Sequence, residues 1–145
     1  MKFKQVHLSL LFIALIFLFL QPISSWKAVR NFRFKNSSPK TIWIGGFGVP
    51  FMPQTGWEMA PYSEKIVYVP ADTVAIRYWA RTGCSWKDNK FVCTTGDCGA
   101  PLNNFGLECR GITGQSPATL IELTLSNSGF PDFYDLSNVD GNNLN

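Results

Sequence analysis

The sequence predicts an all-β domain of the sandwich type, and three observations support this prediction. Five short runs are rich in β-branched and aromatic residues, and glycine or proline directly follows some of them. No stretch after the first 25 residues shows a convincing helical period of apolar residues. All four cysteines lie between positions 84 and 109, among turn-forming residues. Short strands joined by turns favour a sandwich over an α/β fold.

The expected strands follow one another at short spacing. They cover residues 31–35, 41–44, 65–69, 73–79 and 118–125. In the first strand, Phe32 and Phe34 alternate with polar residues, as in a strand with one buried face. The second strand stops at Gly45-Gly46 and the third at Pro70, because glycine and proline interrupt regular strands.

The fourth and fifth expected strands carry charged residues opposite their apolar faces. Ile76 and Tyr78 share one face, which places Arg77 on the other. In the fifth strand Leu123 lies on the apolar face, so Glu122 points the opposite way. A lone arginine or glutamate on a strand is most often simply solvated, and this interpretation stays open beside a functional one.

Residues 1–25 are expected to form a secretory signal peptide, and residues 26–145 the mature domain. Lys2 and Lys4 precede an apolar run of about 13 residues, which small residues follow. A signal anchor is the alternative, but a membrane span needs about 20 apolar residues. We therefore expect a secreted, extracellular protein with no membrane span in its mature chain.

Composition excludes several function classes. The single histidine, His7, lies in the expected signal peptide, so the mature domain lacks the residue for Ser-His-Asp or Cys-His catalysis and for His-based zinc sites. Subtracting Lys2 and Lys4 from the 13 basic residues leaves 11, against 10 acidic residues. This balance does not suggest a nucleic-acid-binding surface. No cofactor is expected.

The cysteine spacing favours disulfides over a metal site. The pattern C-x8-C-x4-C-x10-C lacks the paired C-x2-C units that zinc sites usually use, and secretion favours oxidation. The sequence therefore predicts disulfide bonds and no metal. Four cysteines allow three pairings, which the spacing leaves open.

Two further carboxylates follow Glu122 in sequence that resembles loops. These are Asp135 and Asp140, and together with Arg77 they could line an acidic cleft at the edge of the sandwich. Such a cleft suits a neutral, hydroxyl-rich ligand such as a polysaccharide. Paired carboxylates are also the groups that glycoside hydrolysis uses.

Several segments resemble, in the family's order, the thaumatin-like proteins of pathogenesis-related group 5. The matching segments are 41–43, 56–57, 76–84, 93–99, 117–122 and 132–141. The most specific is Cys93-Thr94-Thr95-Gly96-Asp97-Cys98. The resemblance implies a secreted β-sandwich with disulfide-rich loops and an acidic cleft. It also implies host defence, antifungal action, and binding or weak hydrolysis of β-1,3-glucan.

The resemblance assigns roles to four residues of the expected cleft. The cleft arginine of the family falls on Arg77, its glutamate on Glu122, and two of its aspartates on Asp135 and Asp140. In a hydrolytic mechanism Glu122 would donate a proton to the leaving oxygen, and an aspartate would act as base or nucleophile. Arg77 would hold and orient a carboxylate.

Further expectations concern the loops. The resemblance implies the disulfides Cys84–Cys93 and Cys98–Cys109. Asn36 begins an Asn-Ser-Ser sequence and is a candidate N-glycosylation site. Among the tryptophans, Trp86 in the cysteine-rich segment is expected to be exposed, whereas Trp43 and Trp79 in strands are expected in the core.

The family pattern continues past the turn at Asp140, whereas this sequence stops at Asn145. The resemblance thus implies a short form that lacks the C-terminal part of the family fold, including one wall of the cleft. We expect polysaccharide binding rather than catalysis, any activity being that of a weak endo-β-1,3-glucanase. The alternative is a non-catalytic truncated paralogue or interaction module. Open sheet edges would favour a homodimer.

Overall fold

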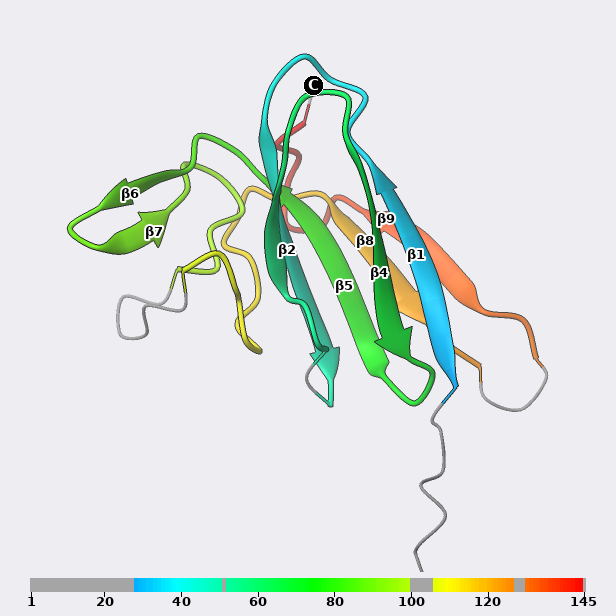
Figure 1. The fold of residues 1–145 in the computed structure, drawn as a ribbon. Coiled ribbons are helices and arrows are strands. Elements are labelled where there is room, and N and C mark those ends of the chain that lie inside the picture. Colours follow the sequence, from blue (N-terminus) through cyan, green and yellow to red (C-terminus); the bar gives the residue numbers. More distant parts are fainter. Residues whose placement is uncertain (1–27, 51, 100–105, 127–129, 145) are drawn as a thin grey trace, which may run out of the picture.

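The computed structural model describes residues 28–50, 52–99, 106–126 and 130–144. The expected signal peptide, residues 1–25, lies outside this described part. Within it the chain forms strands and turns and no helix, which confirms the all-β prediction. The strands, labelled in Figure 1, are β1 (Val29–Lys35), β2 (Ile42–Val49), β3 (Gly56–Met59), β4 (Glu64–Pro70), β5 (Val74–Arg81), β6 (Ser85–Lys87), β7 (Lys90–Val92), β8 (Leu120–Thr124) and β9 (Phe133–Ser137).

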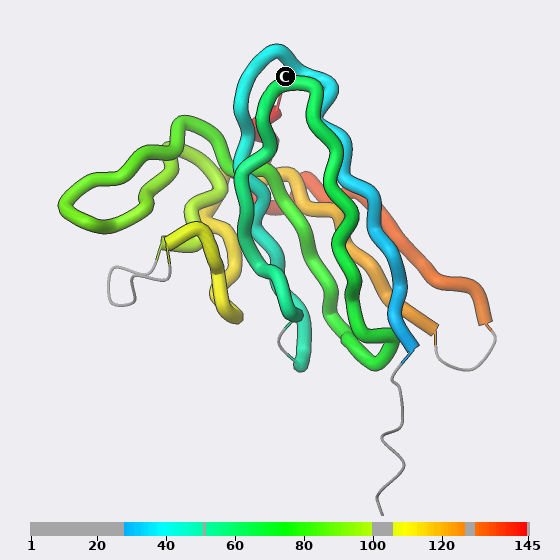
Figure 2. The backbone as a smooth tube through the Cα atoms, in the orientation of Figure 1, coloured from blue at the N-terminus to red at the C-terminus, as the bar shows by residue number. Residues whose placement is uncertain are grey.

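The strands form two layers and a separate hairpin. β3, β2, β5, β8 and β9 make one antiparallel sheet, in that order. β1 and β4 pair as a two-stranded antiparallel ribbon that lies over one face of this sheet (Figures 1 and 2). The β6–β7 hairpin projects to the side, beyond β2 (Figure 1). The architecture is therefore the expected sandwich.

The main core fills the space between the ribbon and the sheet. Its buried members are Ile44, Met52, Trp57, Met59, Val67, Val69, Ile76, Tyr78 and Leu125. The Phe34 ring of β1 meets the rings of Trp57 and Tyr78 edge to face, with centroids 5.0 and 4.8 Å apart. Such pairs add about 0.5–1.5 kcal/mol each to the area they bury. The alternation that predicted β1 and β5 thus places aromatic rings from both layers in one core.

A second, smaller core lies on the opposite face of the sheet, beneath the loops. It contains Trp79, Cys98, Cys109, Ala118 and Leu120. The Trp79 indole N–H donates to the carbonyl of Gly96 at 2.7 Å, and Gly45 lies so close to the indole that a Cβ there would collide with the ring. The middle of the sheet is consequently covered on both faces.

Arg30 fastens the ribbon to the far end of the sheet. Its guanidinium donates to the carbonyl of Ser126 at 3.1 Å and to the carboxylate of Asp132 at 3.3 Å. The backbone N–H of Ser126 is the main cause that holds the pKa of Asp132 below its usual range, and Arg30 adds to it. β1 is therefore anchored beside the connection between β8 and β9.

The five predicted strands correspond to β1, β2, β4, β5 and β8, and four strands were not predicted. β6 and β7 have three residues each, too few to show an alternation, around a tight turn at Asp88-Asn89 with φ of 48° and 60°. β3 is also short. β9 is a correction, because sequence that resembled a loop pairs along its whole length with β8. That pairing puts Asp135 on a strand.

Burial of Tyr78 predicts a specific dependence of stability on pH. Its side chain is 1% exposed, and desolvation raises the pKa of its phenol well above the usual range. The phenol ionises near pH 10 in the unfolded chain but stays protonated in the fold. This tyrosine should therefore make the free energy of unfolding decrease as pH rises above about 10.

The variant Tyr78→Phe should remove that contribution. Because the Tyr78 hydroxyl donates to the sulfur of Met52, a weak acceptor, the change should cost less than about 1 kcal/mol at neutral pH. Above pH 10 the variant should lose less stability than the wild type. Urea denaturation of both proteins at neutral pH and above pH 10 measures this difference in stability loss. Equal alkaline losses in the two proteins would contradict the prediction.

Candidate functional site

Strand register brings three of the four predicted cleft residues together. Arg77 on β5 lies directly opposite Glu122 on β8, and Glu122 lies directly opposite Asp135 on β9. Residues directly opposite one another point to the same face of a sheet. One guanidinium and two carboxylates therefore form a row across three neighbouring strands, on the face away from the ribbon.

Arg77 and Glu122 form an ion pair within this row. Nε of Arg77 lies 2.8 Å from Oε1 of Glu122, and 42% and 31% of the two side chains are exposed. At such exposure the pair contributes less than about 1 kcal/mol to stability, so its main effect is to orient both groups. The contact uses the Glu122 carboxylate as a hydrogen-bond acceptor. This geometry does not suit the proton-donating role expected for Glu122.

An open pocket of about 340 Å³ lies over the same strands. It is lined by Ala75, Ile76, Arg77, Glu122, Leu123, Thr124, Phe133, Tyr134 and Asp135. Phe133 shares the face of Asp135, two residues away, and 66% of its surface is exposed. Sequence reasoning missed Phe133 because the segment was taken for a loop. Its place beside Asp135 follows from the register between β8 and β9, which the sequence of the segment does not show.

Asp140 does not belong to this pocket. It lies exposed in the turn after β9, where its carbonyl accepts a hydrogen bond from the N–H of Ala118 at 3.1 Å. The turn closes through Gly141 N–H donating to the carbonyl of Asn138. Because the chain turns there, Asp140 is carried past the end of the row. The structure thus corrects the expectation that Asp140 lines the cleft with Glu122 and Asp135.

All four cysteines are paired in the structure. Cys84 is bonded to Cys93 and Cys98 to Cys109, which is the pairing that the resemblance implies. The first bridge closes the base of the β6–β7 hairpin. The second lies in the smaller core. Each closes a loop of about ten residues, worth about 3 kcal/mol in the chain-entropy account.

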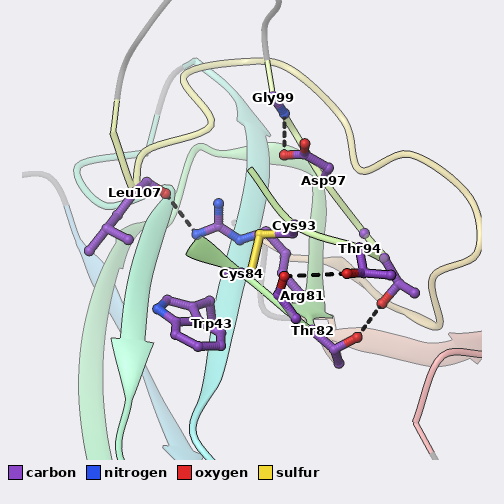
Figure 3. Close-up of a disulfide and its surroundings, with 12 residues drawn as sticks. Trp43, Arg81, Thr82, Cys84, Cys93, Thr94, Asp97, Gly99 and Leu107 are labelled. Atoms are coloured by element: carbon purple, nitrogen blue, oxygen red, sulfur yellow. Dashed lines mark hydrogen bonds between the residues drawn. A yellow bond between two sulfur atoms is a disulfide. The ribbon is translucent and has the colours of Figure 1, made fainter. Parts of the chain in front are cut away.

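Arg81 is a buried cation beside these bridges, and sequence reasoning missed it. It is 1% exposed, and its guanidinium donates to the carbonyls of Ile44 and Leu107, both at 2.8 Å. Figure 3 shows the contact with Leu107. Its Nη1 also lies 3.4 Å from the sulfur of Cys98. Desolvation lowers the pKa of Arg81 to about 10, with Asp97 and Glu108 opposing the shift. Arg81 therefore joins β2, β5 and the second disulfide loop.

Asn36 is a structural residue, which corrects the prediction of a glycan there. Its side-chain N–H₂ donates to the carbonyls of Lys40, Met59 and Ala60 at 2.8–3.2 Å. Its carbonyl oxygen accepts from the N–H and the hydroxyl of Ser38. The residue is only 2% exposed. A sugar on this nitrogen would displace the hydrogen bonds and would have no room in the fold.

The tryptophans lie largely as expected. Trp86 is 59% exposed and Trp79 is 2% exposed. Trp43 is half-buried, with its ring 6.1 Å from that of Phe91 and its N–H donating to Glu58. Phe91 in turn contacts Trp86 edge to face, at 5.4 Å. The exposed Trp86 thus packs against Phe91, which in turn contacts Trp43.

Among the described residues, no group of three or more His, Cys, Asp or Glu side chains could hold a metal ion. In the same ranges there is no helix with the length and apolar character needed to cross a membrane.

Comparison with known proteins identifies the relatives of this chain. The Thaumatin family matches residues 36–145. Pathogenesis-related protein 1A/1B of Hordeum vulgare is 40% identical over 131 residues, which cover 90% of this chain and 70% of the barley protein. Thaumatin-like protein 2 of Prunus persica is 45% identical over 112 residues, or 77% of this chain and 44% of the peach protein. Pathogenesis-related protein 5 of Arabidopsis thaliana is 41% identical over 133 residues, or 88% and 52%.

A solved structure agrees with these relationships. The thaumatin-like xylanase inhibitor TLXI superimposes with a TM-score of 0.58 and 25% sequence identity, over 77% of this chain and 70% of the inhibitor. The family match covers well over half of the sequence and includes every residue of the candidate pocket. The chain therefore belongs to the thaumatin family.

Proposed function

We propose that this protein is a secreted defence protein that binds a neutral polysaccharide of the β-1,3-glucan type. The observation that carries the proposal is the row of Arg77, Glu122 and Asp135 over an open pocket. Carboxylates accept hydrogen bonds from sugar hydroxyls, and a guanidinium donates them. The names of the relatives from barley and Arabidopsis, which are pathogenesis-related proteins, support the role in defence.

Phe133 would add an apolar contact to this polar row. Its exposed ring lies beside Asp135 on the same face and could stack on the apolar side of a pyranose. The combination of one aromatic ring with a few convergent polar groups is typical of small-molecule sites. We place the sugar across β8 and β9, between Phe133 and the Arg77–Glu122 pair.

Binding is favoured over hydrolysis. A glycosidase needs one protonated carboxylic acid and a second carboxylate at the scissile bond. Glu122 accepts a hydrogen bond from Arg77, and Asp140 lies outside the pocket, so Asp135 is the one remaining acid in it. The pocket is also open to solvent on one side, which would exclude water poorly.

Retention on insoluble β-1,3-glucan tests this proposal. The double variant Glu122→Ala/Asp135→Ala should bind more than tenfold more weakly, because each lost charge-assisted hydrogen bond is worth about 1.5–3 kcal/mol. A matched control, Glu64→Ala/Asp140→Ala, removes the same charge outside the pocket and should bind like the wild type. No retention of folded wild-type protein, or equal losses in both double variants, would refute the proposed site.

A second candidate function is inhibition of a glycoside hydrolase. TLXI is named a xylanase inhibitor, and the exposed Trp86 on a disulfide-closed hairpin is a rigid aromatic side chain of the kind that dominates protein interfaces. This is also the form that the interaction-module alternative would take. Inhibition of a fungal endoxylanase that Trp86→Ala abolishes, with glucan retention unchanged, would distinguish it from polysaccharide binding.

A further inference from the structure

The large sheet extends beyond the ribbon that covers it. Figures 1 and 2 show β9 passing behind β1 and emerging on its outer side. On the ribbon-facing side of β8 and β9, Ile121, Tyr134 and Leu136 are 38%, 79% and 71% exposed. We call these three residues the outer β9 face. Tyr134 lies directly opposite Leu123, which packs against the main core, so this face continues the core surface.

The ribbon next to this face has an open edge. Among the described strands, β1 has β4 as its single neighbour. Just beyond the two ends of the β1–β4 pairing, the N–H of Asn36 donates to the carbonyl of Ser63, and the N–H of Ala71 donates to the carbonyl of Ala28. Because hydrogen-bonded pairs alternate in an antiparallel ribbon, even-numbered residues of β1 turn their backbone groups towards β4. The backbone groups of the odd-numbered residues within Val29–Lys35 therefore point outward.

We propose that a second copy of this chain pairs its β1 with this open edge. The two β1 strands run antiparallel about a twofold axis at Phe32, so the two ribbons become one four-stranded layer. The added strand lies beside β1 on the side where β9 emerges, and it covers the outer β9 face. The contact joins backbone hydrogen bonds along the edge to apolar contacts beneath it, as in strand addition to a sheet.

Charge along β1 selects this register. With the axis at Phe32, Asn31 lies opposite Arg33 of the partner subunit, and Val29 lies opposite Lys35 of the partner subunit. No like charges are then directly opposite each other. With the axis at Arg33 instead, two arginines would face each other at the centre. Of these two twofold axes, the one at Phe32 thus keeps the arginines out of direct opposition.

Chain mass in solution, measured by size-exclusion chromatography with light scattering, tests the pairing. The wild type should shift from one chain to two as its concentration rises. Arg33→Pro removes an outward N–H and leaves the pairing with β4 intact, because proline is tolerated where the N–H of an edge strand faces solvent. This variant should stay folded and monomeric. Arg33→Ala removes the same charge but keeps the N–H, and it should still dimerise.

A cross-linking pair keeps the test decisive if Arg33→Pro does not fold. Phe32→Cys places two thiols opposite each other at the axis, in a pair close enough for a disulfide, and should give a covalent dimer. Asn31→Cys faces Arg33 of the partner subunit and should not. A protein that stays monomeric at every concentration overturns the proposal. The proposal is overturned in the same way if another segment of the same chain is what protects the outward amides of β1 from exchange. Equal cross-linking of both variants also overturns it.

Discussion

Replacing Asn36 with alanine should lower the free energy of unfolding by about 3 kcal/mol, because it removes a buried amide that donates to three carbonyls, of which that of Met59 is buried. These carbonyls belong to the connection after β1 and to the end of β3. The Asn36 side chain therefore joins the connection after β1 to the end of β3. Urea denaturation of the oxidised protein measures the loss. The same protein, produced in a eukaryotic secretory system, should carry no glycan at Asn36 by mass spectrometry.

Two companion variants separate the hydrogen bonds from the bulk of the side chain. Asn36→Asp keeps the size and the acceptor for Ser38 but loses both donors and places a carboxylate against carbonyl oxygens, so it should be at least as harmful as alanine. Ser37→Ala changes an exposed neighbour and should cost less than about 0.5 kcal/mol. A stable Asn36→Ala protein, or an occupied glycan site, would show that the buried role is wrong.

Substituting alanine for Gly56 is the second change with a large expected effect. A Cβ at this position would collide with the carbonyl of Leu107, which is backbone and cannot rotate away. That carbonyl also accepts the hydrogen bond from buried Arg81. Displacing it would break the Arg81 contact and loosen the loop that leads to Cys109. We expect a loss of about 3 kcal/mol or more in the free energy of unfolding.

A control on the same short strand is available. Glu58→Ala removes an exposed side chain that accepts a hydrogen bond from Trp43, and it should cost less than about 1 kcal/mol. Thermal unfolding of the oxidised proteins gives the comparison, and near-ultraviolet circular dichroism reports whether the loop around Arg81 remains ordered. If Gly56→Ala and Glu58→Ala had similar effects, the close approach of the loop would not matter for stability.

The faces of the long strands were predictable because successive side chains of a strand point to opposite faces of the sheet. Ile76 and Tyr78 are in the main core, Trp79 is in the smaller core, and Arg77 remains half-exposed between them. The same alternation placed Glu122 on the face of β8 that points away from the face of Leu123. β9 was missed because its five residues include an aspartate and a serine, and its pairing with β8 is not visible in its own sequence.

The candidate site could be predicted only in part, since its residues come from three strands. Arg77 and Glu122 were named because each interrupts an apolar pattern, and Asp135 and Asp140 because they follow Glu122 in sequence that resembles loops. The family resemblance marks the same four residues. The structure separates these two aspartates, since Asp135 is held in register with Glu122 whereas Asp140 follows the turn. Phe133 gained its place from the same register. Asp135 and Asp140 are five residues apart, and this spacing alone could not show which of them lies in the pocket.

By itself, the sequence determined the all-β class, most strands and the residues that face the core, because these depend on alternation within a few residues. It also restricted the chemistry, through the lack of histidine outside the expected signal peptide and the grouping of four cysteines. The tertiary structure decided which strands are neighbours, where the charged row forms, and that Asn36, Gly56 and Arg81 hold loops in place. These features rest on contacts between distant segments, such as Thr55 with Glu108, 53 residues apart, and no local pattern contains them.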